Sequence, residues 1–326
     1  MNPPLLAVEG LTTILHLPSG PAFAVDGIDL EVAEGETLGI VGESGCGKSM
    51  LALSLIGLQP NPPAEVVAGR ALFEGSDLLA QSSESLRAIR GSRIGMIFQE
   101  PMSALNPVMK IGEQIAEVCR RHDRMGARAA WRRAVELLER VGIPDPSTRA
   151  REYPFQLSGG LRQRVMIASA LACGPAMLIA DEPTTALDVT IQAQILDLIR
   201  ELQTGTGMAV ILITHDLGVI AETADRVMVM YAGRKIEEAS ADRLFAGPRH
   251  PYTHGLLSSV PVLGTSRSSR LPEIGGAVPT LGASVDGCAF EPRCDRKGGL
   301  CSRKAPLLAP ASADHLAACH FPRGAP

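Results

Sequence analysis

Short runs of consecutive apolar residues alternate with segments of helical periodicity as far as about residue 245. The runs that predict buried strands are residues 37–41, 72–73, 94–98, 176–180 and 208–214. The segments that predict helices are residues 49–58, 127–141 and 188–202. Because strands alternate with helices, the pattern predicts an α/β core with a parallel sheet, interrupted by a helical insertion from about residue 100.

Two of these helices have an expected buried face and an expected end. The face of residues 127–141 carries Trp131, Val135, Leu138 and Val141, and Gly142 and Pro144 stop the helix. Asp188 is the expected N-cap of the other helix. Its apolar face carries Ile191, Ile195, Leu198 and Leu202.

The remainder of the chain does not continue this alternation of strands and helices. Residues 226–231 and 234–236 predict a β-hairpin that turns at Ala232-Gly233. Residues 260–287 are rich in Pro, Gly and Ser and lack periodicity, which is typical of a linking segment. No internal repeat is visible, so the sequence predicts a single copy of this α/β core.

A G-x-x-x-x-G-K-S loop follows the first apolar run and precedes the first helix. Its residues are Gly42, Glu43, Ser44, Gly45, Cys46, Gly47, Lys48 and Ser49. In such a loop backbone N–H groups cradle nucleotide phosphates, with Lys48 at the β- and γ-phosphates and Ser49 on Mg²⁺. The loop predicts ATP or another nucleotide as ligand, and many unrelated NTPases share it.

Composition narrows the class of protein. The 326 residues are 45% hydrophobic and 20% charged, which is typical of a globular chain. A net charge of −4, a pI near 6.0 and 3% aromatic residues give no reason to expect nucleic acid as a partner. No apolar run approaches the roughly 18–20 residues that cross a bilayer, and residues 1–4 do not begin a secretory signal. We therefore expect a cytoplasmic chain that reaches a membrane only through partners.

The seven cysteines are unevenly distributed. Three are scattered, whereas four crowd the C-terminal segment at Cys288, Cys294, Cys301 and Cys319. In a reducing compartment four clustered thiols are more typical of a metal site than of disulfides. Four thiolates suit tetrahedral Zn²⁺ or an iron–sulfur cluster, and the absence of a C-x₂₋₄-C pair weighs against Zn²⁺.

Further motifs follow the phosphate loop in a particular order. They are Gln99, the stretch Leu157-Ser158-Gly159-Gly160-Leu161, the pair Asp181-Glu182, then Asp188 and His215. Their order and spacing resemble those of ABC-type ATPases. The resemblance implies a P-loop NTPase (RecA-like) α/β core with an ABC helical subdomain.

The same resemblance implies a role for each motif. Gln99 would contact Mg²⁺ and the attacking water, Asp181 would hold Mg²⁺, and Glu182 would polarise the water. Ser158, Gly159 and Gly160 would close on the γ-phosphate held by a second ATPase subunit. Asp188 would bridge the two subunits, and His215 would sense the γ-phosphate.

Several longer stretches resemble the ATP-binding subunits of bacterial oligopeptide/dipeptide ABC importers, and more the first than the second of their two subunit types. These stretches are residues 40–45, 99–107, 162–168, 181–190, 250–253 and 287–294. The implied partners are a second, different ATPase subunit, two transmembrane permeases and, indirectly, a solute-binding protein. The implied location is the cytoplasmic face of the inner membrane.

This resemblance also implies a domain division and a cofactor. The ATPase domain would span residues 1–245, with its core at about 1–98 and 165–245 and its helical subdomain at about 99–164. A small cysteine-rich extension would span residues 246–326, and the phosphate-site residues would lie outside it. Its four cysteines would hold a [4Fe–4S] cluster, with Zn²⁺ as the alternative.

Two positions depart from the family pattern. The family stacks adenine on an aromatic residue upstream of the loop, but counting back reaches Leu15, with His16 beside it and Phe23 nearer the loop. Cys46 occupies a position at which serine is commoner in the family. We interpret it as a small packed side chain rather than as a reactive thiol.

Two other function classes compete with transport. An ABC ATPase acting on nucleic acid or ribosomes is disfavoured by the acidic balance and the single cassette. A metal or redox sensor with a vestigial cassette is disfavoured by the intact Lys48, Asp181, Glu182 and His215.

Overall fold

The computed structural model describes residues 3–100, 104–184, 188–259, 273–279 and 286–324. The chain divides into two units, each with its own internal packing. Unit 1 comprises Met1–Leu5, Val32–Thr37 and Ala80–Ile213, and unit 2 comprises Leu6–Glu31, Leu38–Leu79 and Thr214–Pro326. Within the described ranges, no helix is both long enough and apolar enough to cross a bilayer.

Unit 1 contains a parallel sheet. Its strands are β6 (Ile94–Ile97), β7 (Met177–Asp181) and β8 (Ala209–Ile213). Ile94 pairs with Met177, which on its other side pairs with Ala209. β7 and β8 are buried along their whole length, as parallel strands covered on both faces are. The apolar runs that predicted these strands are confirmed.

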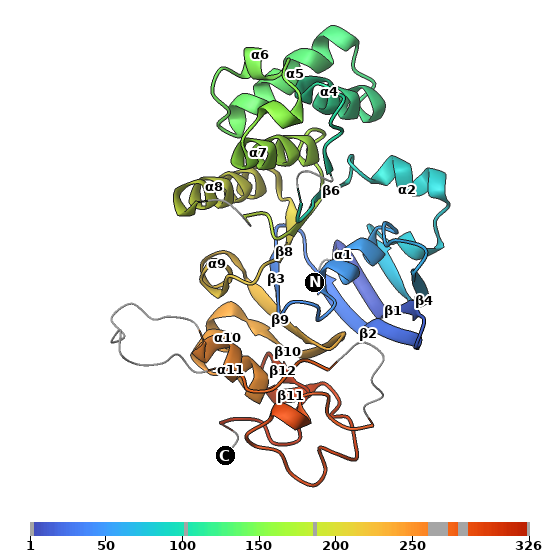
Figure 1. Ribbon diagram of the computed structural model, residues 1–326, viewed down its shortest axis with the longest axis vertical. Helices are drawn as coiled ribbons and strands as arrows, with labels where there is room; N and C mark the ends of the chain where they lie inside the picture. The colour runs from blue at the N-terminus through green and yellow to red at the C-terminus, as the bar shows by residue number, and fades with distance from the viewer. Residues whose placement is uncertain (1–2, 101–103, 185–187, 260–272, 280–285, 325–326) are drawn as a thin grey trace. The chain divides into compact units, whose positions relative to one another are not determined.

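Helices make up most of the rest of unit 1. They are α2 (Ser83–Ile89), α4 (Ile111–His122), α5 (Ala127–Arg140), α6 (Pro146–Arg149), α7 (Gly159–Ala170) and α8 (Val189–Thr206), with a 3₁₀ turn η2 (Pro154–Gln156). Figure 1 shows α4, α5 and α6 gathered together, and both α4 and α5 pack against α7. A helical insertion after residue 100 is therefore confirmed.

The predicted helix at residues 127–141 is confirmed as α5, but its expected buried face is partly wrong. Trp131 and Val135 are only half-buried. The fully buried side chains are Ala130, Ala134, Leu137 and Leu138. The physical reason is that two alanines let α5 approach its neighbours closely, so the face with the small side chains turns inward and the indole stays at the edge.

The predicted cap of α8 is confirmed. The Asp188 carboxylate accepts a hydrogen bond from the backbone N–H of Ile191 at 3.0 Å. The buried apolar residues of α8 are Ile195 and Ile199, so the helix buries a narrower face than its pattern predicted.

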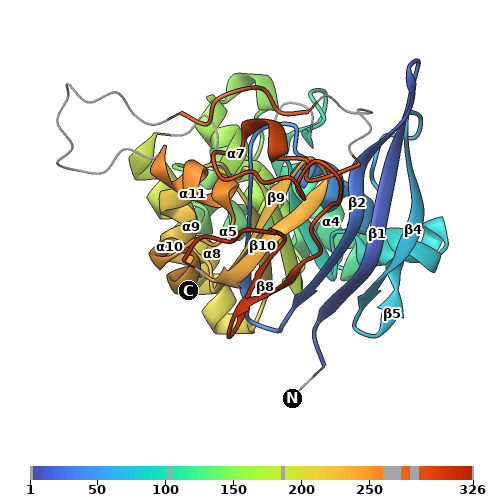
Figure 2. The ribbon, with the colours of Figure 1, turned by 90° about the horizontal axis from the view of Figure 1, so that it is seen from below.

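An antiparallel sheet in unit 2 is a feature that the apolar runs did not predict. Its strands, in the order β2-β1-β4-β5, are β2 (Gly20–Val32), β1 (Leu6–Leu17), β4 (Ala64–Phe73) and β5 (Ser76–Asp77). β1 lies between β2 and β4 in both ribbon views (Figures 1 and 2). Its register shifts at Thr12, and a Cβ on Gly69 of β4 would lie 2.6 Å from the Leu11 Cα. Only glycine permits that approach.

A second sheet in unit 2 carries the phosphate loop and the C-terminal strands. In the order β11-β12-β10-β9-β3, its strands are β11 (Ala309–Ser312), β12 (His315–Ala317), β10 (Arg234–Ser240), β9 (Arg226–Tyr231) and β3 (Thr37–Val41). β3 and β9 are parallel, and β9 and β10 form the predicted hairpin, with Tyr231 opposite Arg234.

The helices of unit 2 are short. They are α1 (Lys48–Leu55), α9 (Leu217–Thr223), α10 (Ala241–Ala246) and α11 (Pro251–Ser258), with 3₁₀ turns η1 (Leu78–Ala80) and η3 (Glu291–Arg293). The predicted helix at residues 49–58 is confirmed as α1, but it ends earlier, because Gly57 takes a positive φ of 62°.

A buried carboxylate on β10 forms hydrogen bonds with residues that lie before and after the linking segment in the sequence. Glu237 of β10 is 0% exposed. It accepts hydrogen bonds from the backbone N–H of His250 at 2.9 Å and from His315 Nε2 of β12 at 2.6 Å. The backbone N–H of Arg249 also donates to it. His250 Nδ1 in turn accepts from the backbone N–H of Tyr252 and caps α11.

We expect this arrangement to make stability depend on pH. Burial lowers the pKa of His250 from its ordinary 6.5 to about 4, although nearby Glu237 opposes the shift. Because the unfolded chain takes up the proton first, stability falls as the pH drops below about 6.5, by about 2 kcal/mol between pH 7 and pH 5. Denaturant unfolding at both pH values measures this.

The matched variant is His250→Asn, whose side-chain oxygen can replace Nδ1 as the helix cap. The pH-dependent loss should shrink by about 2 kcal/mol in this variant. Equal losses in the variant and the wild type would assign the pH dependence to other groups.

Candidate functional site

The loop between β3 and α1 has the backbone of a phosphate-binding loop. Gly45 and Gly47 take φ values of 78° and 104°, which favour glycine. A Cβ on Gly47 would lie 2.2 Å from the Ala24 carbonyl oxygen, and one on Gly42 would lie 2.3 Å from that of Met230. Side chains are thus excluded at two of the loop's glycines, and the N-terminus of α1 follows directly.

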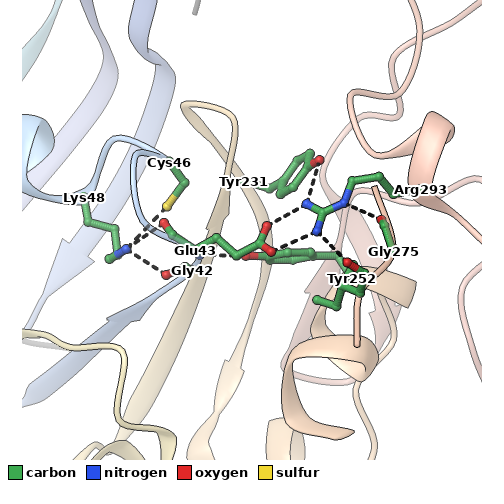
Figure 3. A network of polar contacts seen from close by, with 9 residues as sticks. Gly42, Glu43, Cys46, Lys48, Tyr231, Tyr252, Gly275 and Arg293 are labelled. Atoms are coloured by element: carbon green, nitrogen blue, oxygen red, sulfur yellow. Dashed lines mark hydrogen bonds and ion pairs between the residues drawn. The ribbon is translucent and has the colours of Figure 1, made fainter. Parts of the chain in front are cut away.

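The lysine of this loop is held by the loop's own carbonyl groups. Lys48 Nζ donates to the carbonyl oxygen of Gly42 at 2.7 Å and to that of Glu43 at 3.0 Å (Figure 3). Lys48 is 7% exposed. The ammonium is therefore fixed inside the loop's curve, where a phosphate can replace carbonyl contacts as its partner.

Cys46 is packed, as we expected. It is buried, and burial raises the pKa of its thiol although the Lys48 ammonium lies beside it. A thiol with a raised pKa is a poor nucleophile at neutral pH, so the small-side-chain interpretation of this position holds.

The C-terminal segment contacts the phosphate loop, although the residues predicted to bind phosphate all lie outside that segment. The Glu43 carboxylate forms an ion pair with Arg293 of η3 at 2.7 Å, and the backbone N–H of Glu43 donates to the Tyr252 hydroxyl at 2.8 Å. The physical reason is that the C-terminal segment folds back against β9, where Phe290 packs edge-on to Tyr231 at 5.4 Å.

The acidic pair lies at the end of β7 in unit 1. Asp181 is buried, and Glu182 follows it with a positive φ of 49°, which is rare for a residue with a side chain. The backbone N–H of Glu182 donates to the Ile213 carbonyl of β8 at 2.8 Å. Gln99 Nε2 donates to Glu182 Oε2 at 3.1 Å. The structure thus brings together Gln99 and Glu182, which the sequence paired only through family resemblance.

The signature stretch begins α7. Ser158 is the N-cap, and its hydroxyl accepts from the backbone N–H of Leu161. Gly159 and Gly160 form the first turn, where free N–H groups favour an anion. Sequence reasoning assigned no role to Gln163, which is buried and donates to the Pro183 carbonyl at 2.6 Å. That bond ties the signature helix to the residues just after Glu182.

The remaining nucleotide candidates lie in unit 2. His215 lies two residues after the end of β8 and is exposed. Among the three adenine candidates, Phe23 is 54% exposed, Leu15 is half-buried, and exposed His16 pairs with Glu65 at 2.7 Å. Phe23 therefore offers the accessible π face. Residues 101–103 and 185–187, parts of two motif stretches, lie outside the described residues.

The four tail cysteines lie near one another in unit 2. Burial raises the pKa of Cys319 to about 11, and the thiols of Cys288, Cys294 and Cys301 add to that effect. The backbone N–H of Arg296 donates to Cys294 Sγ at 3.4 Å. Among the described residues, however, no group of three or more His, Cys, Asp or Glu side chains could hold a metal ion as arranged. The expected metal site is thus not supported by the side-chain positions.

This combination of phosphate loop, acidic pair and serine-capped signature helix defines an ATPase cassette of the ABC class, and comparisons with known proteins agree. The ABC transporter family model matches residues 25–185. A dimeric ATP-binding cassette solved with ADP and phosphate superposes with a TM-score of 0.67 at 28% identity, over 72% of this chain and 98% of that one. The predicted α/β P-loop fold is confirmed.

Proteins of similar sequence identify the family more narrowly than the fold does. The model of the oligopeptide/dipeptide transporter C-terminal region matches residues 236–301. A "probable peptide ABC transporter ATP-binding protein" of Sinorhizobium fredii is 52% identical over 97% of this chain and 94% of the relative. The dipeptide transport ATP-binding protein of Bacillus subtilis is 48% identical over the same shares. The chain therefore belongs to the family of ATP-binding subunits of oligopeptide and dipeptide ABC transporters.

Proposed function

We propose that this chain hydrolyses ATP to power the import of di- or oligopeptides, or of a related small solute, through partner permeases. The observation that carries the proposal is the presence in one chain of an ABC cassette and an oligopeptide/dipeptide transporter C-terminal region. The oligopeptide transport ATP-binding protein of Bacillus subtilis, 51% identical over 88% of this chain and 80% of the relative, supports the same solute class. We place the chain at the cytoplasmic face of the inner membrane, bound to the permeases.

We assign the ATPase domain to residues 1–245 and the C-terminal extension to residues 246–326. Within the ATPase domain the core would comprise about residues 1–98 and 165–245, and the helical subdomain about residues 99–164. The location of α4, α5 and α6 within residues 99–164 supports the helical assignment.

The loop's residues fit the triphosphate of ATP. Lys48 would exchange its carbonyl partners for the β- and γ-phosphates, and the glycine backbone would cradle them. Ser49, Gln99 and Asp181 supply the oxygen donors that suit Mg²⁺. When bound, Mg²⁺ neutralises charge on the transferred phosphoryl group.

Hydrolysis needs a base close to the attacking water. Glu182 is our candidate because Gln99 and the strand end hold its side chain and backbone in place. His215, which is exposed two residues after the end of β8, would contact the γ-phosphate and sense whether it is present.

The signature residues act on a neighbour's nucleotide in this proposal. Ser158, Gly159 and Gly160 present a helix N-terminus, which favours an anion, and Asp188 caps a second helix whose start is exposed. We infer that each γ-phosphate is closed between the loop of one ATPase subunit and the signature of the other. The partner would be a second, different ATPase, with a solute-binding protein delivering the peptide.

We further propose that the four tail cysteines take up a [4Fe–4S] cluster, with Zn²⁺ as the alternative. The backbone N–H of Arg296 donates to Cys294 Sγ at 3.4 Å, and such a bond stabilises a thiolate ligand. Cys301 is close to the other three, and its carbonyl oxygen accepts from the backbone N–H of Cys288 at 2.7 Å. The segment would close around the group as it binds.

Anaerobically purified protein should be brown and contain about four iron and four sulfide per chain, because four thiolates match that cluster. Metal and sulfide analysis measures this. Cys294→Ser should lose the iron, whereas Cys173→Ser, outside the tail, should keep it. A colourless protein with about one Zn²⁺ would select the alternative. Protein free of both metals would contradict the proposal.

The proposed transport function can be tested in cells. In the source organism, deletion of this gene should abolish growth on peptides as the sole source of an amino acid that the strain cannot make. Wild-type protein should restore growth, and Lys48→Ala should not, because the ammonium that binds the phosphates is gone. Unchanged peptide use after deletion, with no redundant importer present, would show that the transported solute is not a peptide.

A further inference from the structure

Arg293 and Glu43 form a two-pronged ion pair although they lie 250 positions apart in the chain. One guanidinium nitrogen lies 2.7 Å from Glu43 Oε2 and the other 2.9 Å from Oε1 (Figure 3). A parallel pair of charge-assisted bonds fixes the orientation of both groups. The Arg293 side chain is 4% exposed, so solvent competes little on its side.

The guanidinium is itself held by its surroundings. Arg293 Nε donates to the Gly275 carbonyl at 3.0 Å, and a terminal nitrogen donates to that of Ile274 at 3.1 Å. The group lies over the rings of Tyr231 and Phe290 at 5.8 and 5.9 Å. These contacts with backbone carbonyls and aromatic rings do not involve the phosphate loop. They therefore fix the position of the Arg293 side chain independently of the loop.

Glu43 belongs to the bonding that shapes the loop. Its carbonyl oxygen accepts from Lys48 Nζ at 3.0 Å and from the backbone N–H of Cys46 at 3.3 Å. Its own N–H donates to the hydroxyl of buried Tyr252 in α11. A displacement of Glu43 would therefore move the carbonyl that holds the phosphate-binding ammonium.

We propose that Arg293 is a positioning residue for the phosphate loop, through which the C-terminal segment sets nucleotide affinity. The inference rests on the proposed function, since it requires this loop to bind ATP. Arg293 lies between Cys288 and Cys294, so the segment that carries the thiols also carries the residue that positions the loop. A change in the order of that segment should therefore change the shape of the phosphate loop.

A merely structural pair would behave differently from a positioning pair. If Arg293 only attached the segment, its loss would lower thermal stability and leave the folded loop unchanged. If it positions the loop, the affinity for ATP and for ADP should fall together, since both carry the β-phosphate that the loop cradles. AMP, which lacks that phosphate, serves as the reference.

The test measures the Kd of Mg-ATP, Mg-ADP and AMP for the full-length chain by displacement of a fluorescent nucleotide. Arg293→Gln and Glu43→Gln should each raise the Kd of ATP and ADP about tenfold, the loss of one charge-assisted pair. Arg293→Lys should recover part of the loss. The double variant should be no weaker than either single variant, because both remove the same contact.

The matched control is Arg243→Gln, which removes another ion pair of the C-terminal segment, that with Asp314, away from the loop. It should leave every Kd within twofold of wild type. Hydrogen exchange of the loop amides should quicken in Arg293→Gln and in Glu43→Gln but not in Arg243→Gln. If Arg293→Gln does not fold, Glu43→Gln and Arg293→Lys carry the same comparison.

Unchanged ATP affinity in folded Glu43→Gln and Arg293→Lys, or fully additive effects in the double variant, would overturn the proposal. Failure of the wild-type chain to bind ATP in a Lys48-dependent manner would instead overturn the proposed function. The two failures are thus distinguishable.

Discussion

Glu182→Gln should lower ATP hydrolysis in the assembled transporter by about 10²–10⁴-fold, the usual cost of removing the group that polarises water. Gln99 and the end of β7 hold the carboxylate in place, and an amide of the same shape keeps that position without accepting a proton. Mg-ATP binding should persist, because Lys48 and Ser49 remain. Phosphate release and nucleotide retention, measured on one preparation, check both parts.

The second ATPase subunit must carry the same change at its own glutamate, so that its site does not hide the loss. Gln99→Ala is an informative companion, because it leaves the carboxylate but removes its 3.1 Å contact, and it should lower turnover less than Glu182→Gln. Near-normal turnover with both glutamates replaced would show that Glu182 is not the base.

Ser158→Arg should abolish hydrolysis at the partner subunit's site while leaving ATP binding to this chain's own loop intact. The arginine would occupy the space before the first turn of α7, where a neighbour's γ-phosphate is expected. The isolated chain should accordingly be a poor ATPase whose activity rises with the concentration of its partner. Steady-state hydrolysis at several subunit ratios measures this.

The matched control is Ser82→Arg. Ser82 is also an exposed serine whose hydroxyl caps a helix, in this case α2. It separates the loss of a helix cap, which costs about 1 kcal/mol in either variant, from the loss of the phosphate contact. High activity that is independent of concentration and insensitive to Ser158→Arg would rule out a shared site.

Local chemistry explains which parts of this fold could be predicted. The strands β3, β7 and β8 are buried along their whole length, so nearly all of their residues are apolar and each run is visible at once. Asp188 and the glycine loop are likewise local signals, since capping and phosphate cradling need particular residues at adjacent positions.

The antiparallel sheet of unit 2 escaped prediction for an equally physical reason. The middle of β4 is mostly exposed, and the pairing of β1 with β4 shifts in register at Thr12, so neither strand shows the unbroken period that predicts a half-buried strand. The contact of Glu43 with Arg293 had no local signal at all, because only the folded chain brings residues so distant in sequence together.

Reconstitution tests the central claim most directly. This chain, its partner ATPase and the two permeases are placed in liposomes with the solute-binding protein, and uptake of a labelled peptide is followed with Mg-ATP at the face that carries the ATPases. We predict uptake that requires ATP and that stops with Glu182→Gln in both ATPases, although nucleotide still binds. Uptake that continues in that variant, or ATP hydrolysis that no peptide or binding protein alters, would contradict the account.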